Sequence, residues 1–261
     1  MKKIDINECH KLLLDIAKEF DQICTKHNIP YYMLGGTMLG AIRHKGFIPW
    51  DDDMDFGVPR KYYDKLTKVL EKELPERYQC YTYKNCESIK YPFIKITDSN
   101  TFIYDPKEKS TDKMLIGVNI DIFPLDMCDV NDKKIKNVFH WIKINQMVYV
   151  NAINGGKAKQ FIKNLLKLMF PLSKNKVVGI IDKKLMNLKE GAYLGNILGR
   201  WREKEIIPIE WYGDNCKYKF EDIELNGLKY YDLYLKKLYR DYMELPPENK
   251  RFTHSDEIYY R

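Results

Sequence analysis

The 261-residue sequence lacks long apolar runs and has few cysteines, and both absences exclude classes of protein. A membrane span needs roughly 18–20 consecutive apolar residues, whereas the longest runs, such as Val177–Ile181, are far shorter. Because no apolar stretch follows the lysines of Met1–Asp5, no secretory signal peptide is expected. The six cysteines include no Cys-x-x-Cys pair, which predicts reduced thiols and neither a disulfide framework nor a zinc site. We therefore expect a cytoplasmic protein.

Arginine is missing from the most basic part of the chain. Residues 131–190 contain thirteen lysines against three acids, a net charge of +10, while the whole chain carries +7. Proteins that bind RNA or DNA usually mix arginine and exposed aromatic residues with lysine, so we expect no nucleic-acid partner. Two interpretations remain open. The lysines form a solvated helical face, or the basic amphipathic stretch within residues 157–176 makes peripheral contact with the inner face of a membrane.

The spacing of apolar residues predicts a mixed architecture. Helical spacing covers residues 7–27, 37–44 and 60–74. Runs of β-branched and aromatic residues predict strands at 78–83, 91–97, 101–104 and 117–123. With 44% hydrophobic and 31% charged residues, the chain can bury a core. We expect an α/β (α+β) fold, with a mixed sheet flanked by helices.

Three parts of the chain differ in character. Residues 1–130 carry the helix and strand pattern of a catalytic core, and residues 131–190 form a basic helical insert. Residues 191–261 mix strand-like and helical stretches. We expect this C-terminal segment to face the substrate and to complete the same folding unit.

Four acids lie within five positions, from Asp51 to Asp55, beside apolar neighbours. Carboxylates held so close shift their pKa values or recruit a cation. On a strand, Asp53 and Asp55 would face the same side, because alternate residues share a face. Two such oxygen ligands suit Mg²⁺ (or Mn²⁺). Asp121 lies between two isoleucines on a predicted core strand, where an isolated charge is costly, and a metal ion or a catalytic proton would explain it.

A glycine turn precedes the acids. Gly35, Gly36 and Thr37 follow a predicted strand and begin a helix, where backbone N–H groups can approach a phosphate. Such turns also serve simply to reverse the chain, so the position just before the acids is what favours a phosphate site. Arg43, His44 and Lys45 lie between the two motifs. They could neutralise phosphate charge or form ordinary surface ion pairs.

The order of these motifs resembles the nucleotidyltransferase fold of the DNA polymerase β superfamily. The block Gly36–Asp55, with its Arg-His-Lys-Gly-Phe-Ile-Pro-Trp core, resembles the hallmark of the LicD family of phosphotransferases, which are related to fukutin and fukutin-related protein. Further family-like pieces are Ile120–Asp126, Lys204–Pro208 and Tyr242–Pro247, followed by Arg251 and His254. One departure is Arg240, which stands where the family's Tyr-Gly-Asp-Tyr-Met motif has glycine.

The resemblance implies a metal-dependent phosphotransferase. In this interpretation a CDP-activated alcohol, above all CDP-choline, donates its phospho-alcohol to a sugar hydroxyl of a cell-surface glycan, and CMP leaves. The acceptor would be a teichoic acid, capsule or lipooligosaccharide, either free or lipid-linked. Choline recognition would need an aromatic cage, for which the candidates are Trp201, Trp211, Tyr212, Tyr231 and Tyr242.

The resemblance also implies roles for the motif residues. Asp53 and Asp55 would hold Mg²⁺ or Mn²⁺, and Asp121 would complete the metal site or accept a proton. The donor phosphates would be bound by Gly35, Gly36, Thr37, Arg43, His44 and Lys45. An alternative is a nucleotidyltransferase that moves NMP from an NTP to a small acceptor, because it would use the same glycine turn and acid pair.

Overall fold

The computed structural model describes residues 2–104, 116–150, 164, 168, 172–214, 216–251, 253 and 257–261. The N-terminal half contains α1 (Ile6–Lys26), β1 (Tyr32–Met33), α2 (Gly35–Arg43), β2 (Asp55–Pro59), α3 (Arg60–Glu73), β3 (Tyr78–Tyr81), β4 (Ile94–Asp98), β5 (Thr101–Ile103) and β6 (Asn119–Cys128). The second half contains α4 (Lys133–Asn145), η2 (Gln146–Val150), α6 (Lys174–Met186), β7 (Tyr193–Gly195), η3 (Arg202–Glu205), β8 (Ile206–Pro208), η4 (Ile209–Trp211), β9 (Lys217–Phe220), β10 (Ile223–Asn226), α7 (Tyr231–Tyr239), η5 (Glu248–Lys250) and β11 (Ile258–Tyr260).

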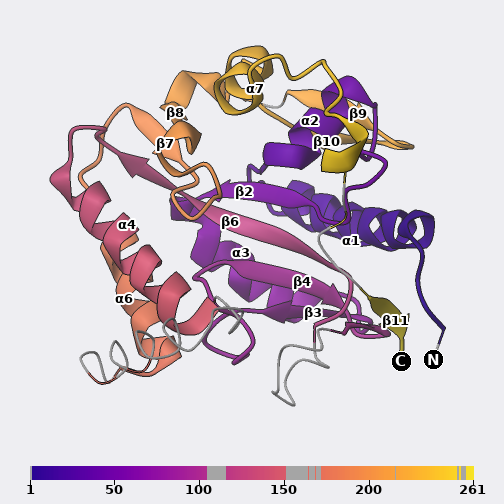
Figure 1. Cartoon of the computed structure of the whole chain (residues 1–261), viewed down its shortest axis with the longest axis horizontal. Coiled ribbons are helices and arrows are strands. Elements are labelled where there is room, and N and C mark those ends of the chain that lie inside the picture. The colour runs from indigo at the N-terminus through magenta and orange to yellow at the C-terminus, as the bar shows by residue number, and fades with distance from the viewer. Residues whose placement is uncertain are drawn as a thin grey trace.

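A seven-stranded sheet forms the centre of the molecule (Figure 1). Five strands follow the order β1-β2-β6-β4-β3, and β7 pairs with the end of β6 and with β8. Strands β2 and β6 are parallel, and the other pairings in this sheet are antiparallel. Helices α1 and α3 pack against one face, while α2 and α7 pack together beside the β9–β10 hairpin (Figure 1). The predicted mixed sheet flanked by helices is confirmed.

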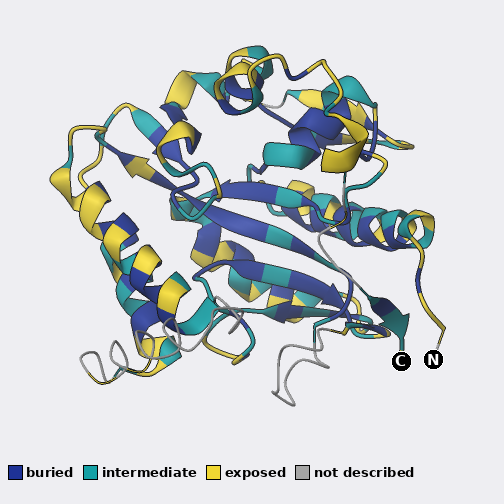
Figure 2. Cartoon of the chain, viewed as in Figure 1, coloured by how far each residue is buried: buried dark blue, intermediate teal, exposed yellow. Residues whose placement is uncertain are grey.

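Buried apolar side chains form two clusters. The larger one runs from Ile4 to Ile258 and includes the central strands, which are mostly buried (Figure 2). The smaller one lies between α4, α6 and the start of β8, and contains Ile142 and Ile181. The larger cluster contains residues from both 1–130 and 191–261, so these two parts of the chain share one core. The domain boundaries at residues 130 and 190 stay a prediction.

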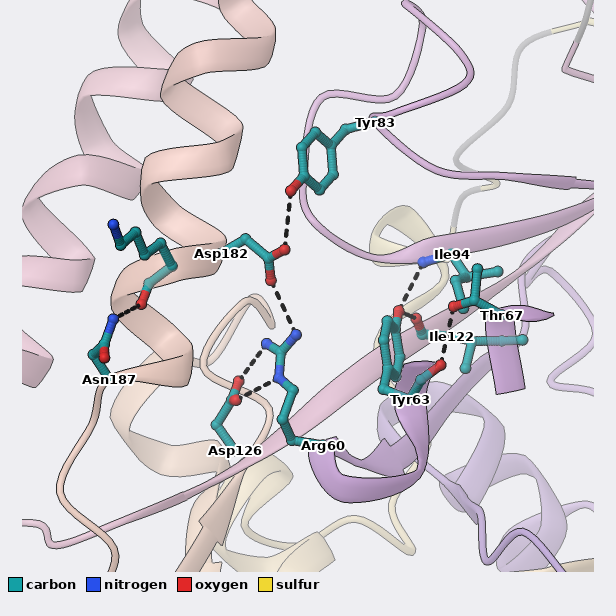
Figure 3. A network of polar contacts seen from close by, with 10 residues as sticks. Arg60, Tyr63, Thr67, Tyr83, Ile94, Ile122, Asp126, Asp182 and Asn187 are labelled. Atoms are coloured by element: carbon teal, nitrogen blue, oxygen red, sulfur yellow. Dashed lines mark hydrogen bonds and ion pairs between the residues drawn. The ribbon is translucent and has the colours of Figure 1, made fainter. Parts of the chain in front are cut away.

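A buried ion network attaches α6 to the sheet (Figure 3). Arg60, the first residue of α3, donates to both carboxylate oxygens of Asp126 on β6, at 2.7 and 3.0 Å, and to Asp182 on α6 at 2.9 Å. The Tyr83 hydroxyl donates to the other oxygen of Asp182 at 3.0 Å. Burial raises the pKa of Asp126, and the Arg60 guanidinium opposes that rise. One arginine therefore joins three elements that are distant in the sequence.

The predictions for the basic stretch 157–176 and for His254 fall largely on residues that the structure does not describe. Within the basic stretch 157–176, residues 157–163, 165–167 and 169–171 lie outside the described residues, as does His254. In the part of the chain that the structure describes, no helix is both long and apolar enough to cross a membrane. All six cysteines are free thiols, as predicted.

Candidate active site

Two of the predicted carboxylates meet where the parallel strands begin. Asp55 is the first residue of β2 and is the direct register partner of Asp121 on β6. The backbone N–H of Asp55 donates to the Thr37 hydroxyl at 2.8 Å, so α2 holds the start of β2. On the other side of β6, Lys95 of β4 is paired with Asp121. Its ammonium group donates to the Asp121 carboxylate and, at 2.8 Å, to Asn119.

Asp53 reaches the same place from a loop. Because β2 begins at Asp55, the prediction that Asp53 and Asp55 share one face of a strand is wrong. The reason is that the ladder with β6 starts at the pair Asp55–Asp121, and the N–H of Asp55 is directed to the Thr37 hydroxyl. Asp51, Asp53, Asp55 and Asp121 nevertheless line one cavity.

The cavity above these acids has a volume of about 660 Å³. Its lining combines an acidic floor with three cationic side chains, Arg200, Arg202 and Lys250. Aromatic side chains supply much of the remaining wall: Trp50, Tyr91, Phe93, Phe123, Trp201 and Tyr239. Of the five aromatic residues that the sequence suggested for a choline cage, Trp201 is the one among these lining residues. A cavity lined by both acidic and cationic side chains can bind an anion together with its counter-cation.

The carboxylates on the floor disfavour each other's charge. Burial raises the pKa of Asp55 well above its usual value, and the charges of Asp53, Asp121, Glu205 and Asp51 raise it further. Burial also raises the pKa of Asp121, but the bonded ammonium of Lys95 opposes that rise. Asp55 would therefore be stabilised by a proton or by a bound cation.

Glu205 is a site residue to which the sequence analysis assigned no role. Glu205 is 4% exposed and lines the cavity. One of its carboxylate oxygens accepts a hydrogen bond from the backbone N–H of Trp201 at 2.9 Å. Burial raises its pKa to about 7, against hydrogen bonds from Trp201 and Asn196 that lower it. Asn196 also lines the cavity, and its side-chain oxygen is buried without a hydrogen-bond partner. The signal that identified Asp121, an acid beside an apolar run, is also present in Glu205-Ile206-Ile207.

Gly35 and Gly36 line the cavity and are the first two residues of α2, which follows β1. The N–H of Gly35 donates to the Tyr234 hydroxyl at 2.9 Å, and Gly35 has a positive φ of 48°. A Cβ at Gly36 would lie 2.6 Å from an oxygen of Asp51, so glycine leaves room for the acid loop. Packing thus accounts for Gly36, and phosphate binding by the turn stays a prediction.

Arg43, His44 and Lys45 are directed elsewhere. Arg43 donates to the backbone carbonyls of Tyr242 at 2.8 Å and Glu244 at 3.2 Å, and to the ring of His44 at 2.9 Å. The described residues that line the cavity do not include these three. Arg43 therefore anchors the segment after α7, and its predicted contact with phosphate remains untested.

The carboxylates of Asp55 and Asp121 suit a metal ion that takes its remaining ligands from the phosphates of a substrate. Among the residues that the structure describes, no group of three or more His, Cys, Asp or Glu side chains could hold a metal ion as it stands. Mg²⁺ commonly binds through one or two carboxylates plus substrate phosphates. The carboxylate oxygens of Asp55 and Asp121, paired across two strands, are donors of the kind that Mg²⁺ and Mn²⁺ prefer.

Comparison with known proteins agrees with the geometry. Residues 28–180 match the family described as "LicD/FKTN/FKRP, nucleotidyltransferase domain". The chain is 29% identical over 268 residues to the lipopolysaccharide cholinephosphotransferase LicD of Haemophilus influenzae, with 97% of each protein covered. It is also 36% identical over 50 residues to the ribitol 5-phosphate transferase FKRP of mouse and human, which is 19% of this chain and 10% of the relative.

Proposed function

Because the chain belongs to the LicD/FKTN/FKRP nucleotidyltransferase family, we propose that it is a metal-dependent phosphotransferase with a DNA polymerase β-like catalytic core. The observation that carries the proposal is the register pair Asp55–Asp121 on the floor of a cavity that also has cationic side chains. Acids for a metal and cations for phosphates are the two requirements of phosphoryl transfer, in which positioning and charge neutralisation dominate.

The cavity is suited to a nucleotide-activated alcohol. Its volume of about 660 Å³ lies within the usual range of small-molecule sites, roughly 300–1,000 Å³. Arg200, Arg202 and Lys250 would bind the diphosphate, and aromatic walls such as Trp201 and Tyr239 would contact the base or a quaternary ammonium. The names of the relatives concern choline phosphate in one case and ribitol 5-phosphate in the other. We therefore infer CDP-choline as the donor and a sugar of a cell-surface glycan as the acceptor, in the cytoplasm.

The chain's own residues would position the reactants and move one proton. Asp53 and Asp55, with Asp121 as a further ligand, would hold Mg²⁺ or Mn²⁺, which when bound neutralises charge on the diphosphate. The sugar hydroxyl oxygen attacks the phosphorus that carries the alcohol, the bond from that phosphorus to the bridging oxygen breaks, and CMP leaves. Asp121 would accept the hydroxyl proton, and the bonded ammonium of Lys95 supports this role because it favours the ionised form of Asp121.

The test measures CMP release with Mg²⁺ from the CDP derivatives of choline, ribitol, glycerol and ethanolamine, with a glycan acceptor present. The four NTPs are assayed in parallel for pyrophosphate. We expect CMP from CDP-choline, and a loss of at least roughly 10–100-fold in Asp55→Asn, because changes at a metal site typically cost that much in activity. The matched control Asp222→Asn removes a surface carboxylate that pairs with Lys18, and it should keep full activity. Pyrophosphate from an NTP would instead support nucleotidyl transfer, and silence from every CDP-alcohol would overturn the proposal.

A further inference from the structure

A basic groove lies between α4 and α6, separate from the acidic cavity. Its volume is about 570 Å³, and we call it the lysine groove after the four lysines among its lining residues: Lys133, Lys134, Asn137, Ile180, Lys183, Lys184 and Asn187. The lining has four ammonium groups and no carboxylate. The two helices are antiparallel here, since Lys134 in the first turn of α4 donates to the carbonyl of Asn187, just after α6, at 3.0 Å.

These four ammonium groups have no ion pairs within the described part of the chain. Lysines elsewhere do, for example Lys18 with Asp222 and Lys236 with Asp232. The acids nearest in sequence are engaged in other contacts. Asp182 is bonded to Arg60 and Tyr83, and Asp132 caps α4 by accepting the backbone N–H groups of Lys134 and Lys189. The charge of Asp132 still attracts Lys134, and Lys184 lies over the Trp141 ring at 5.8 Å from its centroid. With four ammonium groups and no carboxylate in its lining, the groove keeps a net positive charge that an external anion can neutralise.

Helix stability explains only half of this charge. Lys183 and Lys184 lie in the last turn of α6, where the helix dipole favours cations. Lys133 and Lys134 lie at the start of α4, where the helix dipole disfavours cations, and the carboxylate of the N-cap residue Asp132 offsets part of that effect. The helix dipole therefore does not explain these two lysines. A phosphate bound in the groove would interact favourably with all four ammonium groups.

We propose that the lysine groove docks the protein onto a bilayer that contains anionic phospholipids, by binding their phosphates. Exposed apolar side chains favour a lipid surface as the occupant. Val130, just before α4, is 46% exposed, and Met186, the last residue of α6, is 57% exposed, at the same end of the helix pair. Basic residues beside exposed apolar ones are typical of peripheral membrane surfaces. The groove contains neither the arginine nor the aromatic residues that nucleic-acid binders use.

Docking there would also set the distance of the acidic cavity from the membrane. The first turn of α4 lines the lysine groove, whereas Ile142, near its other end, lines the cavity. At about 1.5 Å per residue, Lys134 and Ile142 lie roughly 12 Å apart along the helix axis. The inference does not depend on the proposed chemistry, since it concerns a different surface.

The experiment is co-sedimentation with vesicles of phosphatidylcholine, with and without phosphatidylglycerol, at low and high salt. The test variant is Lys133→Gln, Lys134→Gln, Lys183→Gln and Lys184→Gln together. Its matched control has the same net charge and changes four exposed lysines elsewhere to Gln: Lys11, Lys68, Lys72 and Lys219. Circular dichroism checks that both variants remain folded.

We expect the parent to bind the anionic vesicles and to lose binding at high salt. A lysine near an anionic surface contributes about fivefold in affinity, so the loss of four should weaken binding by up to about 600-fold. The control should change binding far less. Equal losses in the two variants would overturn the groove as the site. Binding to soluble polyphosphate without binding to vesicles would overturn lipid as the occupant.

Discussion

Arg240 has a backbone conformation that few side chains adopt. It follows the last residue of α7 with φ 59° and ψ −115°, and its side chain is exposed. Glycine reaches this region freely, whereas a Cβ makes it costly, and glycine commonly ends helices for this reason. The motif that the sequence resembles has glycine at this position, so the departure at Arg240 places strain beside Tyr239, a residue of the cavity wall.

Arg240→Gly should therefore stabilise the protein. We expect the free energy of unfolding to rise by about 1 kcal/mol. Glycine removes the strain of a side chain at positive φ, roughly 1–3 kcal/mol, and the greater entropy of an unfolded glycine offsets part of that gain. Urea denaturation followed by circular dichroism measures the change. Arg240→Ala is the control, because it removes the side chain but keeps the Cβ, and it should give no such gain. Equal stability of the two variants would contradict the strain.

Glu205 should make stability depend on pH. Its pKa is raised from 4.5 to about 7 in the folded protein, so between these values the unfolded chain releases a proton that the folded chain retains. Stability from this group is complete below about pH 4.5 and is lost as pH rises through 7. The loss amounts to roughly 3 kcal/mol, at 1.36 kcal/mol for each pH unit between the two pKa values.

Glu205→Gln removes this titration while keeping an oxygen for the Trp201 N–H. Relative to the parent, the variant should gain about 3 kcal/mol between pH 4.5 and 8, measured by urea unfolding across that range. Glu210→Gln, at an exposed glutamate close by, is the control and should show no such trend. A flat difference between Glu205→Gln and the parent would contradict a protonated Glu205.

Site residues could be predicted where their local sequence was unusual. Asp55 and Asp121 stood out because carboxylates rarely lie in apolar runs, and the strands bring them into register. The cationic residues Arg200, Arg202 and Lys250 have no such signal, since charged residues in loops are ordinary. The positions of Arg200 and Arg202 depend on how the segment that contains η3 packs against α7, and Lys250 lies farther along the chain in η5, so these positions follow from contacts distant in the sequence.

At the scale of whole elements, strand β6 shows what periodicity could and could not predict. The sequence predicted a strand over 117–123, yet β6 continues through Pro124 to Cys128. Proline lacks an N–H and usually ends a central strand. Here one edge of β6 pairs with β4 only as far as Ile122, and β7 begins to pair at Asp126. Pro124 lies in the gap between these partners, so that edge needs no donor from it.

The contact between β6 and α6 depends on Arg60. Arg60→Ala leaves Asp126, which is 2% exposed, and Asp182 without their counter-charge. We expect a loss of about 3–5 kcal/mol in the free energy of unfolding. Hydrogen exchange should also become faster in α6. Lys61→Ala, at the exposed neighbouring residue, should stay within about 0.5 kcal/mol of the parent.

A second variant tests the cause of that loss. If the uncompensated charge of Asp126 is responsible, adding Asp126→Asn to Arg60→Ala should recover part of the stability. No recovery would show that Arg60 acts through its packing instead.

At the scale of the whole molecule, the two apolar clusters are joined. Tyr91 and Leu198 pack against both, and strands β7 and β8 extend the central sheet toward the smaller cluster. Because the clusters share side chains and one continuous sheet, unfolding of one cluster removes contacts that stabilise the other. The parts that differ in sequence character are therefore expected to unfold together.

We predict a single unfolding transition in urea. Of the four tryptophans, Trp141 packs against the smaller cluster, and Trp50, Trp201 and Trp211 pack against the larger one. The fluorescence of Trp141→Phe therefore reports on the larger cluster, and that of a variant with Trp50, Trp201 and Trp211 changed to Phe reports on the smaller one. Both, and circular dichroism of the same variants, should give one midpoint within each variant. Separate midpoints for two probes within one variant would contradict a single cooperative unit.

The cavity contains residues from both the N-terminal and the C-terminal parts of the sequence, so it can be completed only late in the synthesis of the chain. Asp55 lies on the floor, but Tyr239 of the wall and Tyr234, which holds Gly35, belong to α7. Ribosomes add roughly 5–20 residues per second, so α7 leaves synthesis about 10–40 s after the acids. A nascent chain therefore carries its acid cluster long before it has a complete cavity, and a chain interrupted before α7 is made lacks Tyr239 of the cavity wall and the Tyr234 hydroxyl that binds Gly35.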